Sequence, residues 1–285
     1  MDRIHLVALL TAIIHLTDTL FYAVRLSGVR TRRLITALSL FQLVGLLAGV
    51  ANMVQAPLLS AVVEQAINSG QAIHQAHLQH LLGGIRLIIL AASVGTIAAA
   101  VITPIFIFFM NRAVFVFERT GSVSQLLLLL LSPTRIARLS REFASTRGRY
   151  RRSPLRQGMA AASDMIFRGR PLPLGLLLVH ILVISIWTNG VLAALYAGAL
   201  LPAYRSTASL LSGIVNGIAA ILSNFLIDPV TAVITDQALQ GQRDERDITS
   251  LTYWLICTRL LGTFLAQLIF IPTAHLVEHL TSLMI

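Results

Sequence analysis

The sequence predicts an all-α polytopic membrane protein, and three observations lead to this fold class. Of its 285 residues, 56% are hydrophobic and only 12% are charged, whereas a soluble domain carries about 25% charged residues. Several windows contain the roughly 20 apolar residues that a helix needs to cross about 30 Å of hydrocarbon. These runs are continuous rather than alternating, which excludes an outer-membrane β-barrel. We therefore expect a bundle of transmembrane helices.

Six apolar windows are expected to span the membrane, three on each side of a long polar connector. The first is not a cleavable signal peptide, because it contains Asp18 and runs into an arginine-rich turn rather than a small-residue cleavage site. The spans are expected at residues 4–26, 34–63, 84–110, 174–201, 206–235 and 250–274. The chain is thus expected to form a single transmembrane domain with a first half at 1–116, a connector at 117–172 and a second half at 173–285.

The distribution of arginine predicts the orientation of the spans. The chain has no lysine, and residues 112–170 hold twelve arginines against three acidic residues, so this segment carries +9 (12 − 3) of the chain's +10. Loops on the cytoplasmic side of a membrane are enriched in basic residues. With six spans, the connector and the arginine-rich turn after the first span fall on this side. Both termini and the loop at 64–80 are then expected to face outward.

The arginine-rich connector is expected to bind the membrane surface. Residues 123–131 are apolar but too few to span, so they are predicted to lie in the interface. Ser132 as N-cap and Pro133 at the first helical position predict that a helix begins there. This helix would be amphipathic, with apolar and arginine faces, and would lie on anionic lipids. The basic block at 147–156 either anchors the chain to these lipids or captures a phosphate-bearing head group.

Short matches between the halves suggest an internal repeat. Each half has three spans, so a second copy of the first half would be inverted in the membrane, a plan common in secondary transporters. The repeat predicts that Pro57 superposes on Pro229 and Gly95 on Gly262. The matched segments are GTIAAAVITP (95–104) with GTFLAQLIFIP (262–272), YAVRLSGVRT (22–31) with YAGALLPAYRST (196–207), and QAPL (55–58) with IDPV (227–230).

Polar side chains inside the spans share helical faces. On the first span, Thr11, His15, Asp18, Tyr22 and Arg25 are spaced by three or four residues, which places them on one face. A charge at mid-bilayer costs at least about 2.5–3.5 kcal/mol and usually marks a substrate, ion or proton path. We therefore predict a polar seam through the bundle. Its expected residues are Asp18, Tyr22, Arg25, Arg30, Asn52, Gln55, Arg86, Asn216, Asn224, Asp228, Asp236, Arg259 and Gln267.

Structural roles are the alternative interpretation of the same residues. Asp18, Asp228 and Arg259 could form buried pairs that only stabilise the fold. Gly45 and Gly49 form a GxxxG pair, which is typical of close helix packing in membranes. Pro57 and Pro229 are each expected to break a helix and to free backbone carbonyl groups that line a cavity or bond elsewhere.

No metal site or cofactor is expected. The sequence HLVEH (275–279) matches the zinc pattern H-x-x-E-H but has no evident third ligand, and His74, His77 and His80 are expected to form a hydrated loop. The single cysteine, Cys257, excludes an internal disulfide and any multi-cysteine metal centre. The chain also lacks the GxxxxGK[ST] loop that binds nucleotide phosphates, so it is not expected to hydrolyse ATP. No nucleic-acid partner is expected, and a homodimer stays open.

With these residues in view, the chain resembles the Amj family, the alternate lipid II flippases of bacterial cell-wall synthesis. The resemblance covers nearly the whole chain. In the family an acidic residue often stands where this chain has Ala203, so no role is carried to that position. The most specific segments are HLTDTLFYAVRLSGVRT (15–31), ANMVQAPL (51–58), TNGVLAALYAGALLPAYRSTA (188–208), LSGIVNGIAAIL (211–222), FLIDPVTAVITD (225–236) and TRLLGTFLAQLIFIP (258–272).

The resemblance implies a protein of the bacterial cytoplasmic membrane that carries lipid II, an undecaprenyl-diphosphate-linked disaccharide-pentapeptide, to the outer leaflet. It does not imply an energy source. The residues agree with this function, because the planar guanidinium group of arginine binds phosphate through two hydrogen bonds. Asp18 and Asp228 would either pair with Arg25 or Arg259 until substrate arrives, or carry protons.

Two other functions remain as alternatives to the flippase. One is a proton-coupled transporter of small solutes. The other is a membrane enzyme that processes polyprenyl phosphates, such as a phosphatase. The enzyme would need a nucleophile or paired catalytic groups at one interface, whereas the carboxylates of this chain are spread among the helices, so we do not expect an enzyme.

Overall fold

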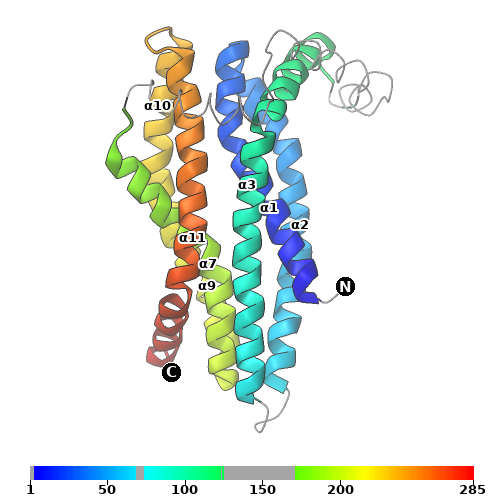
Figure 1. Cartoon of the computed structure of the whole chain (residues 1–285), viewed down its shortest axis with the longest axis vertical. Helices are drawn as coiled ribbons and strands as arrows, with labels where there is room; N and C mark the ends of the chain where they lie inside the picture. Colours follow the sequence, from blue (N-terminus) through cyan, green and yellow to red (C-terminus); the bar gives the residue numbers. More distant parts are fainter. Residues whose placement is uncertain (1–2, 69–73, 123, 125–170) are drawn as a thin grey trace.

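The computed structural model describes residues 3–68, 74–122, 124 and 171–285, and every regular element in these ranges is helical (Figure 1). The first half contains α1 (Arg3–Thr31), α2 (Leu34–Asn68) and α3 (His74–Thr120). The second half contains α7 (Leu174–Leu200), the 3₁₀ turn η1 (Pro202–Tyr204), α8 (Arg205–Leu210), α9 (Ser212–Leu222), the π-helical turn η2 (Ser223–Ile227), α10 (Asp228–Leu239) and α11 (Glu245–Leu283).

Six segments of the described residues are long and apolar enough to cross a membrane: α1, α2, α3, α7, the composite segment Pro202–Leu239, and α11. The prediction of an all-α protein with six spans is therefore confirmed. The predicted amphipathic, arginine-rich connector falls almost entirely on residues outside the described ranges.

The helices are longer than the predicted spans. α3 has 47 residues, which at 1.5 Å per residue makes it about 70 Å long. The predicted loop at 64–80 was wrong in extent, because residues 64–68 continue α2 and residues 74–80 belong to α3. An apolar window marks only the stretch that lipid can surround. The backbone hydrogen bonds of a helix continue beyond this stretch into polar residues, so the helix ends are set by other signals.

The two prolines expected to break helices behave differently. α2 continues through Pro57 to Asn68, so the prediction for this residue was wrong. Proline removes one hydrogen bond, and the other turns of a long helix still hold it together. Pro229 stands at the start of α10, directly after the π-helical turn η2. The helical register therefore changes just before Asp228, which is common at functional sites.

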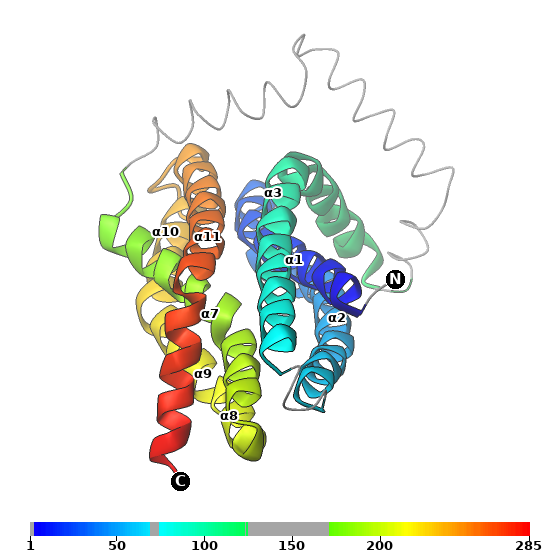
Figure 2. The same ribbon diagram turned by 60° about the horizontal axis from the view of Figure 1, so that its bottom comes forward.

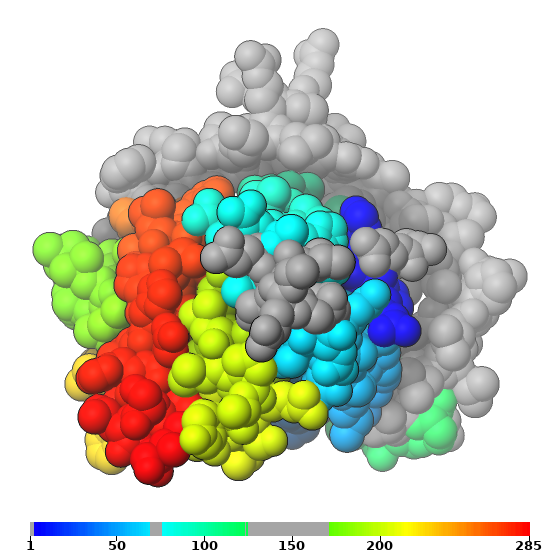
Figure 3. All heavy atoms as spheres, turned by 90° about the horizontal axis from the view of Figure 1, so that it is seen from below, coloured from blue at the N-terminus to red at the C-terminus, as the bar shows by residue number. Residues whose placement is uncertain are grey.

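α1 and α7 are the central helices of the two halves. α1 packs against α2, α3 and α11, while α7 packs against α11 and α9 (Figures 1 and 2). The lower end of the bundle is closed by a buried apolar cluster that draws on five helices, including Val7 of α1, Leu59 of α2, Ile89 of α3, Leu192 of α7 and Phe270 of α11. Seen from below, α11 lies beside α7 and α8, and α3 lies beside α2 (Figure 3).

Two glycines make equivalent contacts in the two halves. A Cβ atom added at Gly95 of α3 would lie 2.2 Å from the carbonyl oxygen of Ala12 on α1. A Cβ atom at Gly262 of α11 would lie 2.8 Å from the carbonyl oxygen of Ile181 on α7. In each half the last long helix thus packs on the first through a glycine. This agrees with the proposed pairing of Gly95 with Gly262, but the superposition of the two halves stays a prediction.

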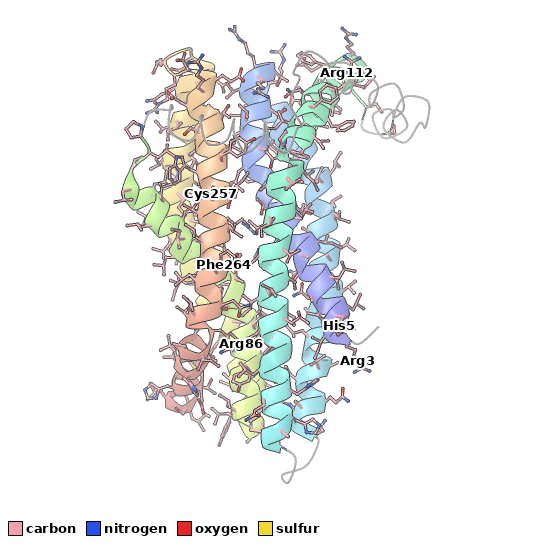
Figure 4. All side chains as sticks on the ribbon, viewed as in Figure 1. Arg3, His5, Arg86, Arg112, Cys257 and Phe264 are labelled. Carbon is pink, nitrogen blue, oxygen red and sulfur yellow. The ribbon has the colours of Figure 1, made fainter. Side chains whose placement is uncertain are left out.

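The arginine-rich turn after α1, the end of α3 and the α10–α11 turn lie at the same end of the bundle (Figure 1). Arg112 lies at this upper end, whereas Arg3 and Arg86 lie in the lower part (Figure 4). The end of α11 is also in the lower part (Figure 1). The two arginine-rich segments thus lie at one end, as the predicted orientation of the spans requires. The assignment of this upper end to the cytoplasm stays a prediction.

Candidate functional site

A cavity of about 680 Å³ lies in the upper and middle part of the bundle. It is lined by residues of α1 and α2 from the first half and of α7, α9, η2, α10 and α11 from the second. Seven of the thirteen residues predicted for the polar seam line this cavity. They are Asp18, Tyr22, Arg25, Asn52, Asn216, Asp228 and Arg259.

The structure places the other six predicted residues outside the cavity. Three of them make contacts between helices: Arg30 donates to Glu245 at 2.7 Å, Gln55 donates to Thr11 at 3.0 Å, and Gln267 donates to the carbonyl oxygen of Arg86 at 2.7 Å. The side chains of Arg86, Asn224 and Asp236 are exposed. Their positions within the expected spans were compatible with the seam, but the rotation of their helices turns these side chains away from it.

Two ion pairs cross from one half of the molecule to the other inside the cavity. Arg259 Nη2 of α11 lies 3.2 Å from Asp18 Oδ2 of α1. Arg25 Nη2 of α1 lies 3.6 Å from Asp228 Oδ1 of α10. The four side chains carry a net charge of zero (+2 − 2). The pairs therefore join the halves without leaving the cavity with excess charge.

The two members of each pair differ in their access to the cavity. The side chains of Arg259 and Arg25 are only 8% and 15% exposed, whereas those of Asp18 and Asp228 are 47% and 48% exposed. All four residues line the cavity, and in each pair the carboxylate is the more exposed partner.

Several polar atoms in the cavity walls are buried and have no hydrogen-bond partner among the described residues. They are Nε of Arg259, Nη1 of Arg25, Nδ1 of His15 and Oδ1 of Asn216. Buried polar groups of proteins are nearly always hydrogen-bonded, and each exception needs an explanation. Two of these four atoms, Nε of Arg259 and Nη1 of Arg25, can only donate, so they suit a ligand that accepts hydrogen bonds.

Tyr22 is held by a chain of hydrogen bonds, and the bond that Thr258 makes to the backbone assigns a direction to it. Thr258 Oγ1 donates its hydrogen to the carbonyl oxygen of Trp254 at 2.8 Å, so it can only accept from His180 Nδ1, 2.7 Å away. His180 Nε2 then carries no hydrogen and accepts from the Tyr22 hydroxyl at 2.9 Å. This leaves the lone pairs of the Tyr22 oxygen to accept from Arg259 Nη1 at 3.3 Å. The chain therefore holds Nη1 of Arg259, while Asp18 accepts from its Nη2 at 3.2 Å.

The sequence analysis did not select His180, although it lines the cavity. The signal was present, because an ionisable side chain within a transmembrane span marks a functional site by default. His180 stands in an apolar stretch of α7, and no residue three or four positions before or after it is polar. Trp187 and Thr188 follow only two turns later. A search for stripes on one helix therefore passes over it.

Replacing Tyr22 with phenylalanine is expected to reduce both stability and transport. The change leaves His180 Nε2 without its donor and Arg259 Nη1 without its acceptor, and one unsatisfied buried group costs about 1–3 kcal/mol. Thermal unfolding of the purified variant measures the first effect. Replacing His180 with glutamine should be milder, because its amide can still accept from Tyr22 and donate to Thr258. Equal losses in both variants would contradict this hydrogen-bond chain.

The pair Gly45 and Gly49 does not pack against another helix. A Cβ atom at either position would meet nothing within 4 Å, and both residues line the cavity. The interpretation of this GxxxG pair as a helix-packing contact was therefore wrong. The spacing that lets two helices approach closely also produces a smooth helix face, and only the position of the neighbouring helices distinguishes the two uses.

Comparison with known proteins assigns the chain to a family. The Amj family, described as "Alternate to MurJ", matches residues 10–281. The lipid II flippase Amj of Bacillus subtilis (strain 168) is 33% identical over 280 residues, which cover 94% of this chain and 93% of that protein. No solved structure matches the chain significantly. The match extends over both halves and includes every residue that lines the cavity. The chain therefore belongs to the Amj family.

Proposed function

We propose that this chain is a lipid II flippase of the bacterial cytoplasmic membrane and that its cavity receives the polar head of the lipid. The name of the Bacillus subtilis relative supports the substrate. The observation that carries the proposal is the pair of Arg–Asp contacts between the halves on the walls of one cavity. Such a protein moves its substrate between leaflets and leaves it chemically unchanged.

The arginines are suited to the diphosphate of the lipid. A guanidinium group stays charged and offers a planar set of donors that matches phosphate oxygens. In this structure Asp18 and Asp228 are the more exposed partners of Arg259 and Arg25. We infer that the diphosphate replaces these carboxylates as it binds, and that the pairs form again when it leaves. The carboxylates then stabilise the empty site, in which two buried cations would otherwise be unpaired.

The shape of the cavity supports transport by alternating access. On α1 its lining extends from Arg25 to Ile14, a rise of about 17 Å along the helix axis. Below it, the apolar cluster around Leu59 and Phe270 closes the bundle. Transporters built from two halves rock one half against the other around a central site. Opening the lower end requires this cluster to separate, while the ion pairs between the halves break and form again.

Cells that can be depleted of their other lipid II flippases provide the test. Expression of this chain is expected to restore growth and to expose lipid II in the outer leaflet. Arg25→Ala should abolish both, because it removes one of the two diphosphate-binding groups. Arg30→Ala is the matched control, since Arg30 lies on the same helix and pairs with Glu245 outside the cavity.

Each alternative function gives a different result in these cells. A transporter of small solutes would leave lipid II in the inner leaflet, and an enzyme that processes the lipid would release phosphate from it. Full complementation by Arg25→Ala at normal protein levels would contradict the proposed role of the cavity. The cytoplasmic position of the arginine-rich end, the binding of anionic lipids and a homodimer stay predictions.

A further inference from the structure

The lining of the cavity changes in character along the axis of the bundle. The Arg25–Asp228 pair lies near its upper end, and Asp18, which pairs with Arg259, stands two turns or about 10 Å farther down α1. The ion pairs between the halves are thus confined to the upper and middle parts of the cavity. Below them, His15 is the one ionisable residue among the described residues that line the cavity. This lower part therefore binds a ligand mainly through uncharged groups.

Two helices of the second half, α7 and α9, meet at this lower part. On α7, Trp187 lies two turns beyond His180, in the direction of the apolar cluster that closes the lower end. Asn216 of α9 reaches α7 one turn farther on, where a Cβ atom at Gly190 would lie 2.0 Å from the Oδ1 atom of Asn216. Only a glycine leaves room for the amide here. Trp187 and Gly190 are three residues apart on one face of α7, so the amide lies beside the part of α7 that carries Trp187.

The amide groups at this depth lack partners within the described part of the chain. Asn216 Oδ1 is buried and accepts no hydrogen bond from a described residue. Asn52 of α2 lines the same cavity, one turn above the point at which Gln55 donates to Thr11, and its amide bonds to no described residue. An amide both donates and accepts, as does a hydroxyl group, whereas the oxygens of an ionised diphosphate only accept. These amides therefore suit a neutral, hydroxyl-bearing part of a ligand.

Trp187 adds a large, flat apolar surface to these polar groups. It lines the cavity and is 42% exposed. Thr188, the next residue, donates its hydroxyl hydrogen to the carbonyl oxygen of Ile184 at 2.7 Å, so toward a ligand it can only accept. A sugar ring matches this combination. Its C–H groups pack against an aromatic face, and the hydroxyl groups around its edge donate to and accept from amides and a threonine oxygen.

We propose that the lower part of the cavity is a sugar subsite, formed by Trp187, Thr188, Asn216 and Asn52, which binds the sugar ring that is attached to the diphosphate of a lipid. This proposal rests on the proposed function and names the residues that select its substrate. Trp187 covers one face of the ring, and the amides bond to its edge.

The subsite lets the protein distinguish a lipid carrier that is loaded with a sugar from an unloaded one. Both carriers offer a diphosphate to Arg25 and Arg259. Only the loaded carrier also fills the lower part of the cavity and supplies hydrogen-bond partners to its amides. A group that is built to bond to a hydroxyl discriminates against a ligand that lacks this hydroxyl, so the unloaded carrier binds more weakly.

The fluorescence of Trp187 tests the subsite without any change within it. The chain has two tryptophans, and Trp254 does not line the cavity, so Trp254→Phe leaves Trp187 as the only fluorophore of this kind. The probes are a short-chain polyprenyl diphosphate and the same diphosphate esterified to one N-acetylhexosamine. The sugar-bearing probe should shift the emission of Trp187, because the ring displaces water from it, and the bare diphosphate should not. The control, Trp187→Phe, retains Trp254 and should respond to neither probe. Equal shifts with both probes in Trp254→Phe overturn the proposal.

Equilibrium binding of the two radiolabelled probes to the full chain tests the individual residues. The unchanged protein should bind the sugar-bearing probe about tenfold more tightly, a preference of about 1.4 kcal/mol. Trp187→Leu and Asn216→Ala should remove this preference and leave the affinity for the bare diphosphate unchanged. Trp254→Leu and Asn224→Ala are the matched controls outside the cavity and should keep it.

The ratio of the two affinities separates a role in binding from a role in folding. A variant that is poorly folded loses affinity for both probes alike, and so should Arg259→Gln, which removes a diphosphate-binding group. Only a residue of the sugar subsite changes the ratio. A preference that survives in both Trp187→Leu and Asn216→Ala overturns the proposal, as does equal binding of the two probes to the unchanged protein.

These measurements need binding alone, so their failure differs from a failure of the proposed function. A chain that prefers the sugar-bearing probe but exposes no lipid II in flippase-depleted cells contradicts the proposed transport and supports the subsite. A chain that exposes lipid II but binds both probes equally contradicts the subsite and leaves the transport function in place.

Discussion

Replacing Arg259 with glutamine is expected to reduce lipid II transport about 100-fold or more, because two hydrogen bonds to a charged group at about 1.5–3 kcal/mol each are lost. Arg259 is the most deeply buried charged group of the cavity, and it contacts both Asp18 and Tyr22. Glutamine fills a similar volume but has no charge to offer the diphosphate. The rate at which lipid II appears in the outer leaflet of flippase-depleted cells measures the effect.

The loss of stability in this variant should be smaller than for most buried ion pairs. Removing one partner of a fully buried pair costs about 3–5 kcal/mol, since the other charge is left unpaired. Here the remaining charge, Asp18, is 47% exposed toward the cavity, where water can solvate it. Arg259→Gln should therefore reach the membrane at nearly normal levels and fail in transport. A purely structural pair predicts the opposite, a fall in protein level with normal transport by each remaining molecule.

Two other variants control this result. Arg259→Lys should restore transport only in part, because lysine keeps the charge and loses the planar set of donors. Arg243→Gln should leave transport unchanged, since Arg243 lies at the α10–α11 turn and contacts Asp247 at 3.9 Å, outside the cavity. If Arg259→Gln transports at the rate of Arg243→Gln, the cavity does not bind the head group through this residue.

Replacing Gly95 with alanine is expected to destabilise the protein by about 3 kcal/mol, at the upper end of the range for overpacked cores. The added methyl group would lie 2.2 Å from the carbonyl oxygen of Ala12. The obstacle is backbone, which cannot rotate out of the way as a side chain could. α3 and α1 must therefore separate, and the shift spreads to the residues of α1 that line the cavity. The thermal unfolding midpoint of the purified protein measures the change.

Gly83 supplies the control on the same helix. A Cβ atom there meets nothing within 4 Å, so Gly83→Ala should leave the midpoint unchanged or raise it slightly, because alanine favours the helix by about 1 kcal/mol over glycine. Gly262→Ala should resemble Gly95→Ala, since its Cβ atom would lie 2.8 Å from the carbonyl oxygen of Ile181. An unchanged midpoint in Gly95→Ala would show that α1 and α3 do not pack as closely as described.

The sequence predicted the features that depend on a single helix. The length and composition of each apolar run determined the six spans, because the hydrocarbon thickness sets the number of residues needed to cross it. The spacing of Asp18, Tyr22 and Arg25 placed them on one face of α1, and all three line the cavity. Helical geometry relates these residues to each other directly, so no knowledge of the neighbouring helices was needed.

The features that depend on two helices were decided by the tertiary structure. The sequence analysis allowed Asp18 and Asp228 to pair with Arg25 or Arg259 but left open which carboxylate meets which arginine, and it did not bring His180 to Tyr22. It placed Asn224 in the seam, although the helix turns this residue outward.

By itself, then, the sequence determined the fold class, the number of spans and the polar face of α1. Which carboxylate pairs with which arginine, and the open space beside Gly45 and Gly49, depend on how one helix is rotated and shifted against another. These are set by contacts between distant segments, such as Gly95 against Ala12. Helical periodicity describes the positions around one helix axis, and it contains no information on where the next axis lies.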